Sequence, residues 1–114
     1  MKIREIATIV QAEVLCGASL LDEVQTNAFA SDLMSDVLTI KVDNFMLITG
    51  LANIQSIRTA EMSDVKCILL VRDKKAPEEM IALAQENDMV LLSTPFSMFK
   101  TAGLLFSAGL CPVY

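Results

Sequence analysis

Three short runs of apolar residues recur at an even spacing along the second half of the chain. They begin at residues 45, 67 and 89, and they lack the apolar–polar alternation of a strand with one face in water. Continuous apolar runs of this length favour strands that are covered on both faces, as in a parallel sheet. A helix-length segment joins each run to the next, so the pattern predicts parallel strands near Phe45–Thr49, Cys67–Val71 and Met89–Ser93.

The first connecting segment is predicted to be a helix over Ile54–Met62. Gly50 allows a tight turn after the strand, and Asn53 can cap the helix because its side-chain oxygen accepts a backbone N–H bond. The helix is not cleanly amphipathic, since Arg58 and Glu61 fall within its apolar arc. Either they pair with one another at the i, i+3 spacing, or they meet a second subunit.

Two further helices follow the second and third strands. One has Pro77 in its first turn and ends at Asn87. The other is expected over Phe96–Ala108, after a cap supplied by Ser93 and Thr94. Apolar residues cover more than half of the circumference of this last helix, so we expect it to be buried on two sides or to pack against a partner.

The N-terminal part of the chain, residues 1–43, carries shorter elements. We expect a helix over Lys2–Gln11, a short strand over Val14–Cys16, an edge strand over Val24–Phe29 and a helix over Leu33–Leu38. Ser31 or Asp32 can cap the last of these helices. Residues 44–110 then form repeated β-α units, and Leu110–Tyr114 is a final short strand or a tail. Together, these elements predict one α/β domain over residues 1–114, with three layers and a central, mostly parallel sheet flanked by helices.

The hydrophobic content of the chain exceeds what one small core needs. Hydrophobic residues make up 54% of the 114 residues, against about 45–50% in typical globular domains. No apolar run approaches the roughly 20 residues of a membrane-spanning helix. Self-association would cover the surplus, so we expect a homodimer that meets through Phe96–Ala108 or Ile54–Met62.

The net charge and the cysteines indicate which classes of partner and which cellular compartment to expect. The net charge is −5 and no basic residues cluster, which argues against nucleic-acid binding. The first residues lack the features of a signal peptide. Cys16, Cys67 and Cys111 lie far apart in apolar surroundings, so they are expected to be free, buried thiols in a reducing cytoplasm.

Motifs for catalysis are not found in the chain. It contains no histidine, which is the commonest general base and metal ligand. Neither a phosphate-binding P-loop nor a dinucleotide-binding glycine motif occurs. Asp32 and Asp36 stand four residues apart and could share a cation, but a capping residue and a solvated carboxylate explain them more simply. We therefore expect no enzymatic activity, no metal and no cofactor.

Polar residues collect where the predicted parallel strands end, which is where open α/β sheets bind their ligands. The residues at this rim are Thr49, Gly50, Asn53, Arg72, Asp73, Ser93, Thr94 and Ser97. Free N–H groups of the helix starts together with one arginine would make a weak anion site. The alternative is that Asn53, Ser93 and Thr94 are ordinary helix caps and that Arg72 is solvated.

The order of these features resembles the DRTGG-domain family in its small, stand-alone form. The segments that carry the resemblance are MKIREIA, ASDLMSDVL, MLITGLANI, CILLV, APEEMIALAQEN and LLSTPFSMFKTAGLL. The resemblance implies an α/β regulatory module that is often dimeric. Related domains are attached to phosphotransacetylases and to CBS-containing pyrophosphatases, where the implied ligand is an adenine nucleotide, and one precedes the catalytic part of HPr kinases. Stand-alone members tend to be encoded near iron-only hydrogenase subunits.

The chain departs from the family at the residues that give it its name. The family shows Gly-Asp-Arg after the first central strand, where this chain has Gly50-Leu51-Ala52-Asn53. It shows Thr-Gly-Gly after the second, where this chain has Val71-Arg72-Asp73-Lys74. Two roles are therefore expected as alternatives. One is a non-catalytic module that senses a nucleotide or small anion at the rim, and the other is an interaction or assembly subunit, associated with iron-only hydrogenase, that has no small ligand.

Overall fold

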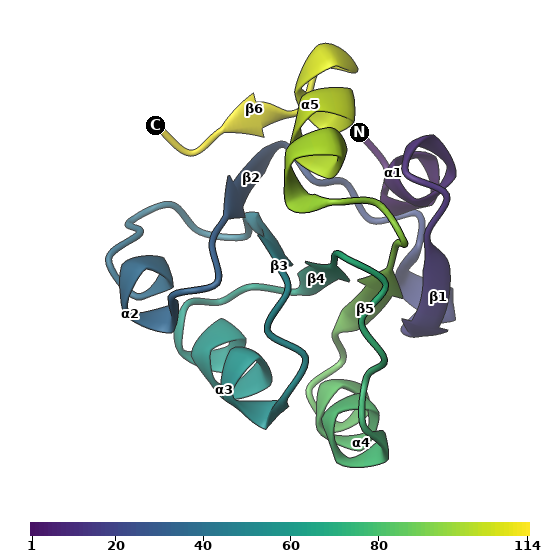
Figure 1. Cartoon of the computed structure of the whole chain (residues 1–114). Helices are drawn as coiled ribbons and strands as arrows, with labels where there is room; N and C mark the ends of the chain where they lie inside the picture. Colours follow the sequence, from purple (N-terminus) through teal and green to yellow (C-terminus); the bar gives the residue numbers. More distant parts are fainter.

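Six strands form a single sheet in the computed structural model, which describes residues 1–114 (Figure 1). The strands are β1 (Glu13–Cys16), β2 (Asn27–Ala30), β3 (Met46–Thr49), β4 (Cys67–Leu70), β5 (Val90–Ser93) and β6 (Cys111–Pro112). Their order across the sheet is β1-β5-β4-β3-β2-β6. Only β1 runs antiparallel to its neighbour. The sheet is thus mostly parallel, as the apolar runs predict, and the three central strands lie within one residue of their predicted bounds.

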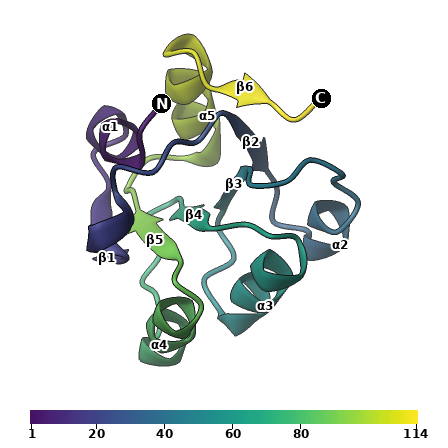
Figure 2. The same cartoon turned by 180° about the vertical axis from the view of Figure 1, so that it is seen from behind.

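Helices cover both faces of this sheet. They are α1 (Ile3–Ile9), α2 (Met34–Val37), α3 (Ile54–Met62), α4 (Glu78–Glu86) and α5 (Met98–Ser107), with a short 3-10 turn at Ala18–Leu20. Figures 1 and 2 show α2, α3 and α4 on one face, and α1 and α5 on the other. Each of the first three connects two adjacent parallel strands. The fold is therefore the three-layer α/β arrangement expected from the sequence.

Each face of the sheet has its own hydrophobic core, because successive strand residues point to opposite sides. Leu47 and Ile68 pack with α2, α3 and α4. Ile48 and Leu69 pack in the second core with α1 and α5. All four are at most 2% exposed. Burial of one such side chain contributes roughly 1.5–3 kcal/mol, so the central strands hold the three layers together.

Strand β2 and helix α2 differ from their predictions. β2 is not an edge strand, because β6 pairs with its outer side in parallel. Helix α2 is shorter than predicted, and Leu33 and Leu38, the two ends of the predicted helix, lie outside it and are 58% and 48% exposed. Neither Ser31 nor Asp32 is its N-cap residue, which is Leu33. The Ser31 hydroxyl instead accepts a bond from the Leu33 N–H, which leaves Asp32 free to reach another loop.

Helix α5 also starts later than predicted. Its N-cap is Ser97, whose side chain accepts the Lys100 N–H bond, rather than Ser93 or Thr94. Thr101 of this helix is fully buried, whereas the two phenylalanines of α5, Phe99 and Phe106, are exposed.

Three smaller expectations meet different outcomes. Asn53 caps α3 as predicted, through a bond from the Gln55 N–H. Arg58 and Glu61 form no ion pair, and both side chains are exposed. All three cysteines are free; Cys16 and Cys67 are buried as predicted, but Cys111 is exposed because β6 lies at the edge of the sheet.

No helix is both long and apolar enough to cross a membrane.

Candidate functional site

The path of β2 brings Asp32 to the edge of the sheet where the parallel strands end. β2 runs parallel to β3, with Ala30 opposite Ile48. The Ser31 N–H extends this ladder by donating to the Ile48 carbonyl at 3.0 Å. Asp32 therefore lies beside the end of β3, next to the predicted rim residues Thr49 and Gly50.

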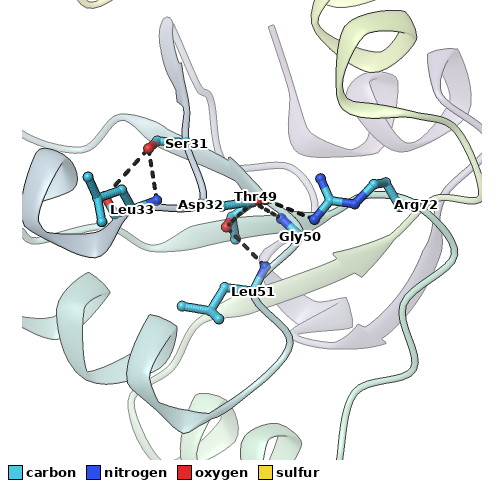
Figure 3. Close-up of polar contacts among 7 residues, drawn as sticks. All are labelled: Ser31, Asp32, Leu33, Thr49, Gly50, Leu51 and Arg72. Carbon is cyan, nitrogen blue, oxygen red and sulfur yellow. Dashed lines mark hydrogen bonds and ion pairs between the residues drawn. The ribbon is translucent and has the colours of Figure 1, made fainter.

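The Asp32 carboxylate accepts hydrogen bonds from three residues on two neighbouring strand ends (Figure 3). One oxygen, Oδ1, accepts the Gly50 backbone N–H at 2.6 Å and the Thr49 hydroxyl at 3.1 Å. The other, Oδ2, accepts Nη2 of Arg72 at 2.8 Å, which also makes an ion pair. Both oxygens are thus held by donors that belong to the ends of β3 and β4.

These donors favour the ionised form of the carboxylate. Partial burial is the largest single influence on the pKa of Asp32, and it acts in the opposite direction, because burial disfavours the charged form and raises the pKa. The bonds from Gly50, Arg72 and Thr49 and the positive charge of Arg72 together outweigh it, so that the pKa of Asp32 is lowered. The arrangement is therefore an anion site whose present anion is a side chain of the protein.

The backbone around Arg72 is fixed by contacts with the next loop. Arg72 and Asp73 both have left-handed backbone angles, with φ of 67° and 57°. The Arg72 N–H donates to the Phe96 carbonyl at 2.8 Å, and the Asp73 N–H donates to the Thr94 carbonyl at 3.1 Å. The guanidinium group itself stays accessible, because the Arg72 side chain is 42% exposed and its partner Asp32 is 46% exposed.

Other predicted rim residues are occupied by structural bonds. Asn53 and Ser97 cap their helices. Ser93 donates its hydroxyl to the Lys74 carbonyl. Thr94 is fully buried and donates its hydroxyl to the Val10 carbonyl at 2.6 Å. Asp73 has an exposed side chain.

The structure therefore brings three of the predicted residues together on one anion, namely Thr49, Gly50 and Arg72. Asp32, which completes the cluster, was expected as a helix cap or, together with Asp36, as a cation ligand, and not as a partner of Thr49, Gly50 and Arg72. Its position directly after a strand is the signal that would have placed it at this rim. That signal requires knowing that β2 runs parallel to β3, which residues 24–29 alone do not reveal.

The larger cavities lie away from these residues. One, of about 470 Å³, includes Gln25, Asn44 and Lys66, at the edge where the parallel strands begin. Another, of about 340 Å³, lies between α5 and the strands β2 and β6. In the Asp32 cluster, by contrast, the Asp32 and Arg72 side chains are half-exposed and cover the buried Thr49 and Gly50, so that a solute has direct access to Arg72.

Comparison with known proteins identifies relatives of the whole fold. The family model described as the DRTGG domain matches residues 5–108. A similar solved structure is that of the CBS and DRTGG domains of the regulatory region of Clostridium perfringens pyrophosphatase, complexed with the activator diadenosine tetraphosphate. Its TM-score is 0.67 at 16% sequence identity, and the match covers 98% of this chain and 48% of that chain. This chain thus spans about half of that regulatory region. No curated protein matches it.

Proposed function

Because this chain belongs to the DRTGG-domain family, we propose that it is a cytoplasmic regulatory module without catalytic activity, which binds a small anion or an adenine nucleotide at the carboxyl edge of its sheet. The observation that carries this proposal is the convergence of the Thr49 hydroxyl, the Gly50 N–H and the Arg72 guanidinium on one carboxylate. The same kinds of donor bind phosphate and carboxylate groups of ligands.

The position of the cluster and the guanidinium group of Arg72 suit a phosphorylated ligand. It lies at the carboxyl ends of β3 and β4, where open α/β sheets bind their ligands. An arginine can offer two parallel N–H groups to one phosphate. The adenine nucleotide is proposed by analogy with the pyrophosphatase regulatory region, whose activator is a diadenosine polyphosphate.

The acid in this cluster is poorly suited to catalysis. An effective general base has a pKa near the working pH. The pKa of Asp32 is lowered, although burial alone would raise it, because Gly50, Arg72 and Thr49 stabilise the charged form. The carboxylate is thus a weak proton acceptor, and the chain has no histidine to replace it. Binding without turnover is the function that these groups support.

Isothermal titration calorimetry with AMP, ATP and inorganic phosphate tests the proposal. We expect saturable binding of at least one of these by the wild-type protein, and loss of that binding in Arg72→Ala. Lys74→Ala is the matched control, because Lys74 is an exposed cation in the same loop. Equal binding by wild type and Arg72→Ala, or no binding of any of the three, would contradict the proposed function.

A second role, assembly, is favoured by the exposed face of α5 that lines the cavity beside β2 and β6. Phe99 and Phe106 are 90% and 68% exposed. Ala102 and Gly103 lie between them, and no atom stands within 4 Å of the position of a Cβ on Gly103. Residues 99, 102, 103 and 106 share one face of a helix, and their spacing is the same read in either direction. We name this face the α5 stripe.

A symmetric stripe suits contact with a second copy of the chain. In a two-fold interface the same surface meets itself, and two α5 helices crossing antiparallel would place Phe99 of one copy near Phe106 of the other. Phenylalanines bury roughly 150–250 Å² each, so four of them would supply a large part of the 1,200–2,000 Å² or so of a stable interface. Helix α3 is less suitable, because its exposed apolar residues, Ile54 and Met62, are at opposite ends.

Sedimentation equilibrium at micromolar concentration tests this second role. We expect a dimer mass for the wild type and a monomer mass for Phe99→Glu. Ser107→Glu introduces the same charge on α5 outside the stripe and should remain dimeric. A monomeric wild type would contradict the homodimer.

The family resemblance adds iron-only hydrogenase as a partner for this second role. Co-purification of the protein with hydrogenase subunits, from a host that contains both, tests that association.

A further inference from the structure

We propose that Asp32 is a resident substitute for the ligand, so that an external oxyanion binds by displacing this carboxylate from Thr49, Gly50 and Arg72. The inference rests on the proposed function and adds how the site is regulated. In this account ligand binding and the attachment of the β2–α2 connection to the strand ends exclude one another. The occupied site and the Asp32-bound site are two states of one switch.

Thr49, Gly50 and the backbone of Arg72 are more firmly fixed than the Asp32 carboxylate, whereas the Arg72 guanidinium is held by Asp32 alone. Thr49 and Gly50 are buried at the end of β3, in the centre of the sheet. Thr49 Oγ1 also accepts the Leu51 N–H at 3.1 Å, which fixes its position further. The backbone of Arg72 is bonded to the Phe96 carbonyl. The anion site therefore does not depend on Asp32 for the placement of its donor backbone.

Asp32, in contrast, belongs to a surface connection. It is followed by Leu33, which is 58% exposed, and by the four-residue helix α2. Its side chain is nearly half exposed and makes no bond apart from those to the three donors. Rotation of this side chain into water would break three hydrogen bonds and leave no buried charge, because water can solvate the freed carboxylate.

Electrostatic repulsion makes an external oxyanion and the Asp32 carboxylate compete for the same donors. With Asp32 in place, the single positive charge of Arg72 is already neutralised by a bond of 2.8 Å. A phosphate placed beside the carboxylate would bring two negative charges together around one cation, which is unfavourable. A phosphate or carboxylate that takes the place of Asp32 meets the same three donors without that repulsion. The site thus accepts a ligand that carries a terminal oxyanion.

The test compares anion affinity in three purified variants. Asp32→Asn removes the charge and keeps the shape, and Asp32→Ala empties the site. Asp36→Asn removes an exposed charge four residues away and serves as the control. The probes are inorganic phosphate and AMP, measured by calorimetry, with circular dichroism and melting temperature to establish that each variant is folded.

Removing the competing carboxylate should tighten binding. If the Asp32-bound state exceeds the open state by roughly ten to one, the apparent Kd falls about tenfold when the carboxylate is removed. We expect this gain in Asp32→Asn and in Asp32→Ala, no gain in Asp36→Asn, and loss of binding when Arg72→Ala is added to either Asp32 variant. Folded Asp32 variants that bind phosphate and AMP no more tightly than the wild type would overturn the inference.

The result separates this inference from the proposed function. Binding by the wild type without any gain in the Asp32 variants leaves the proposed function in place and rejects competition by Asp32. Binding by the variants alone, abolished by Arg72→Ala, supports the competition and rejects sensing by the wild-type protein at the tested concentrations. No binding by any variant overturns both.

Discussion

The guanidinium group of Arg72 occupies the space in front of Gly50 that a side chain at position 50 would need. A Cβ atom there would overlap with the terminal nitrogens and the central carbon of the guanidinium group. The backbone of Gly50 lies outside the left-handed region, so its conformation alone does not require glycine. Glycine at this position is instead what allows Arg72 to approach Asp32 across the end of β3.

Gly50→Ala is expected to displace Arg72 while leaving the domain folded. The exposed ion pair with Asp32 contributes about 0–1 kcal/mol, and replacing glycine by alanine recovers a similar amount by restricting the unfolded chain. The melting temperature should therefore change little, whereas anion binding should fall as it does in Arg72→Ala. Unchanged binding in a folded Gly50→Ala protein would mean that Arg72 reaches the anion by another path.

The Asp32 contacts are expected to make stability depend on pH in the acidic range. Because the pKa of Asp32 is lowered in the folded state, its contribution is complete above the unfolded value of about 4. It is lost as pH falls through the folded pKa, where the carboxyl group takes up a proton. Urea unfolding of wild type and Asp32→Asn should differ at neutral pH and converge in acid. A difference that does not change with pH would show that the charge of Asp32 is unimportant for stability.

Gly17 is expected to be the glycine least tolerant of substitution. Its φ is +87°, and a Cβ would lie 2.7 Å from the Met89 carbonyl oxygen and 2.8 Å from Cα of Val90. Gly17→Ala should destabilise the protein by more than about 1 kcal/mol, through both backbone strain and this clash with β5. Gly109→Ala is the control, because Gly109 has a similar φ of +109° but open space around it. Equal losses in denaturant unfolding would exclude a contribution from the clash.

The core strands and most helices were predictable because their signals are local. Apolar runs and capping residues lie within a few positions of the element that they specify, and Ile54–Met62 with its Asn53 cap agrees with its prediction at both ends. The pairing of β2 between β3 and β6 depends on residues far apart in the chain. The short segment 24–29 carries no information about that pairing.

The candidate site was predictable only in part for the same reason. Thr49, Gly50 and Arg72 follow clear strands, so their common edge could be inferred from the sequence. Asp32 lies 17 to 40 residues away from its partners along the chain. Its role follows from the direction of β2 alone. Thr94 was predicted to cap the last helix and Ser97 to be a rim residue, but tertiary contacts bury Thr94 and leave Ser97 as the cap of α5.

Thiol reactivity should distinguish the three cysteines. Burial raises the pKa of the Cys67 thiol to about 12, and Cys16 is also buried, whereas Cys111 is exposed. Because the thiolate is the reactive form, a disulfide reagent should modify one thiol rapidly in the folded protein and all three after unfolding. Cys111→Ser should abolish the rapid phase. Rapid labelling of Cys67 in the folded protein would contradict its placement in the centre of the sheet.

The most direct measurement of the central claim is the amide resonance of Gly50, followed by heteronuclear NMR during titration with AMP and with inorganic phosphate. This N–H now donates to the Asp32 carboxylate, so replacement of that acceptor by a ligand oxygen must change its environment. We predict a saturable shift of Gly50 that is accompanied by shifts of Thr49 and Arg72 and is absent in Arg72→Ala. A Gly50 resonance that does not move up to millimolar ligand, or a shift that persists in Arg72→Ala, would contradict an anion site at the end of β3.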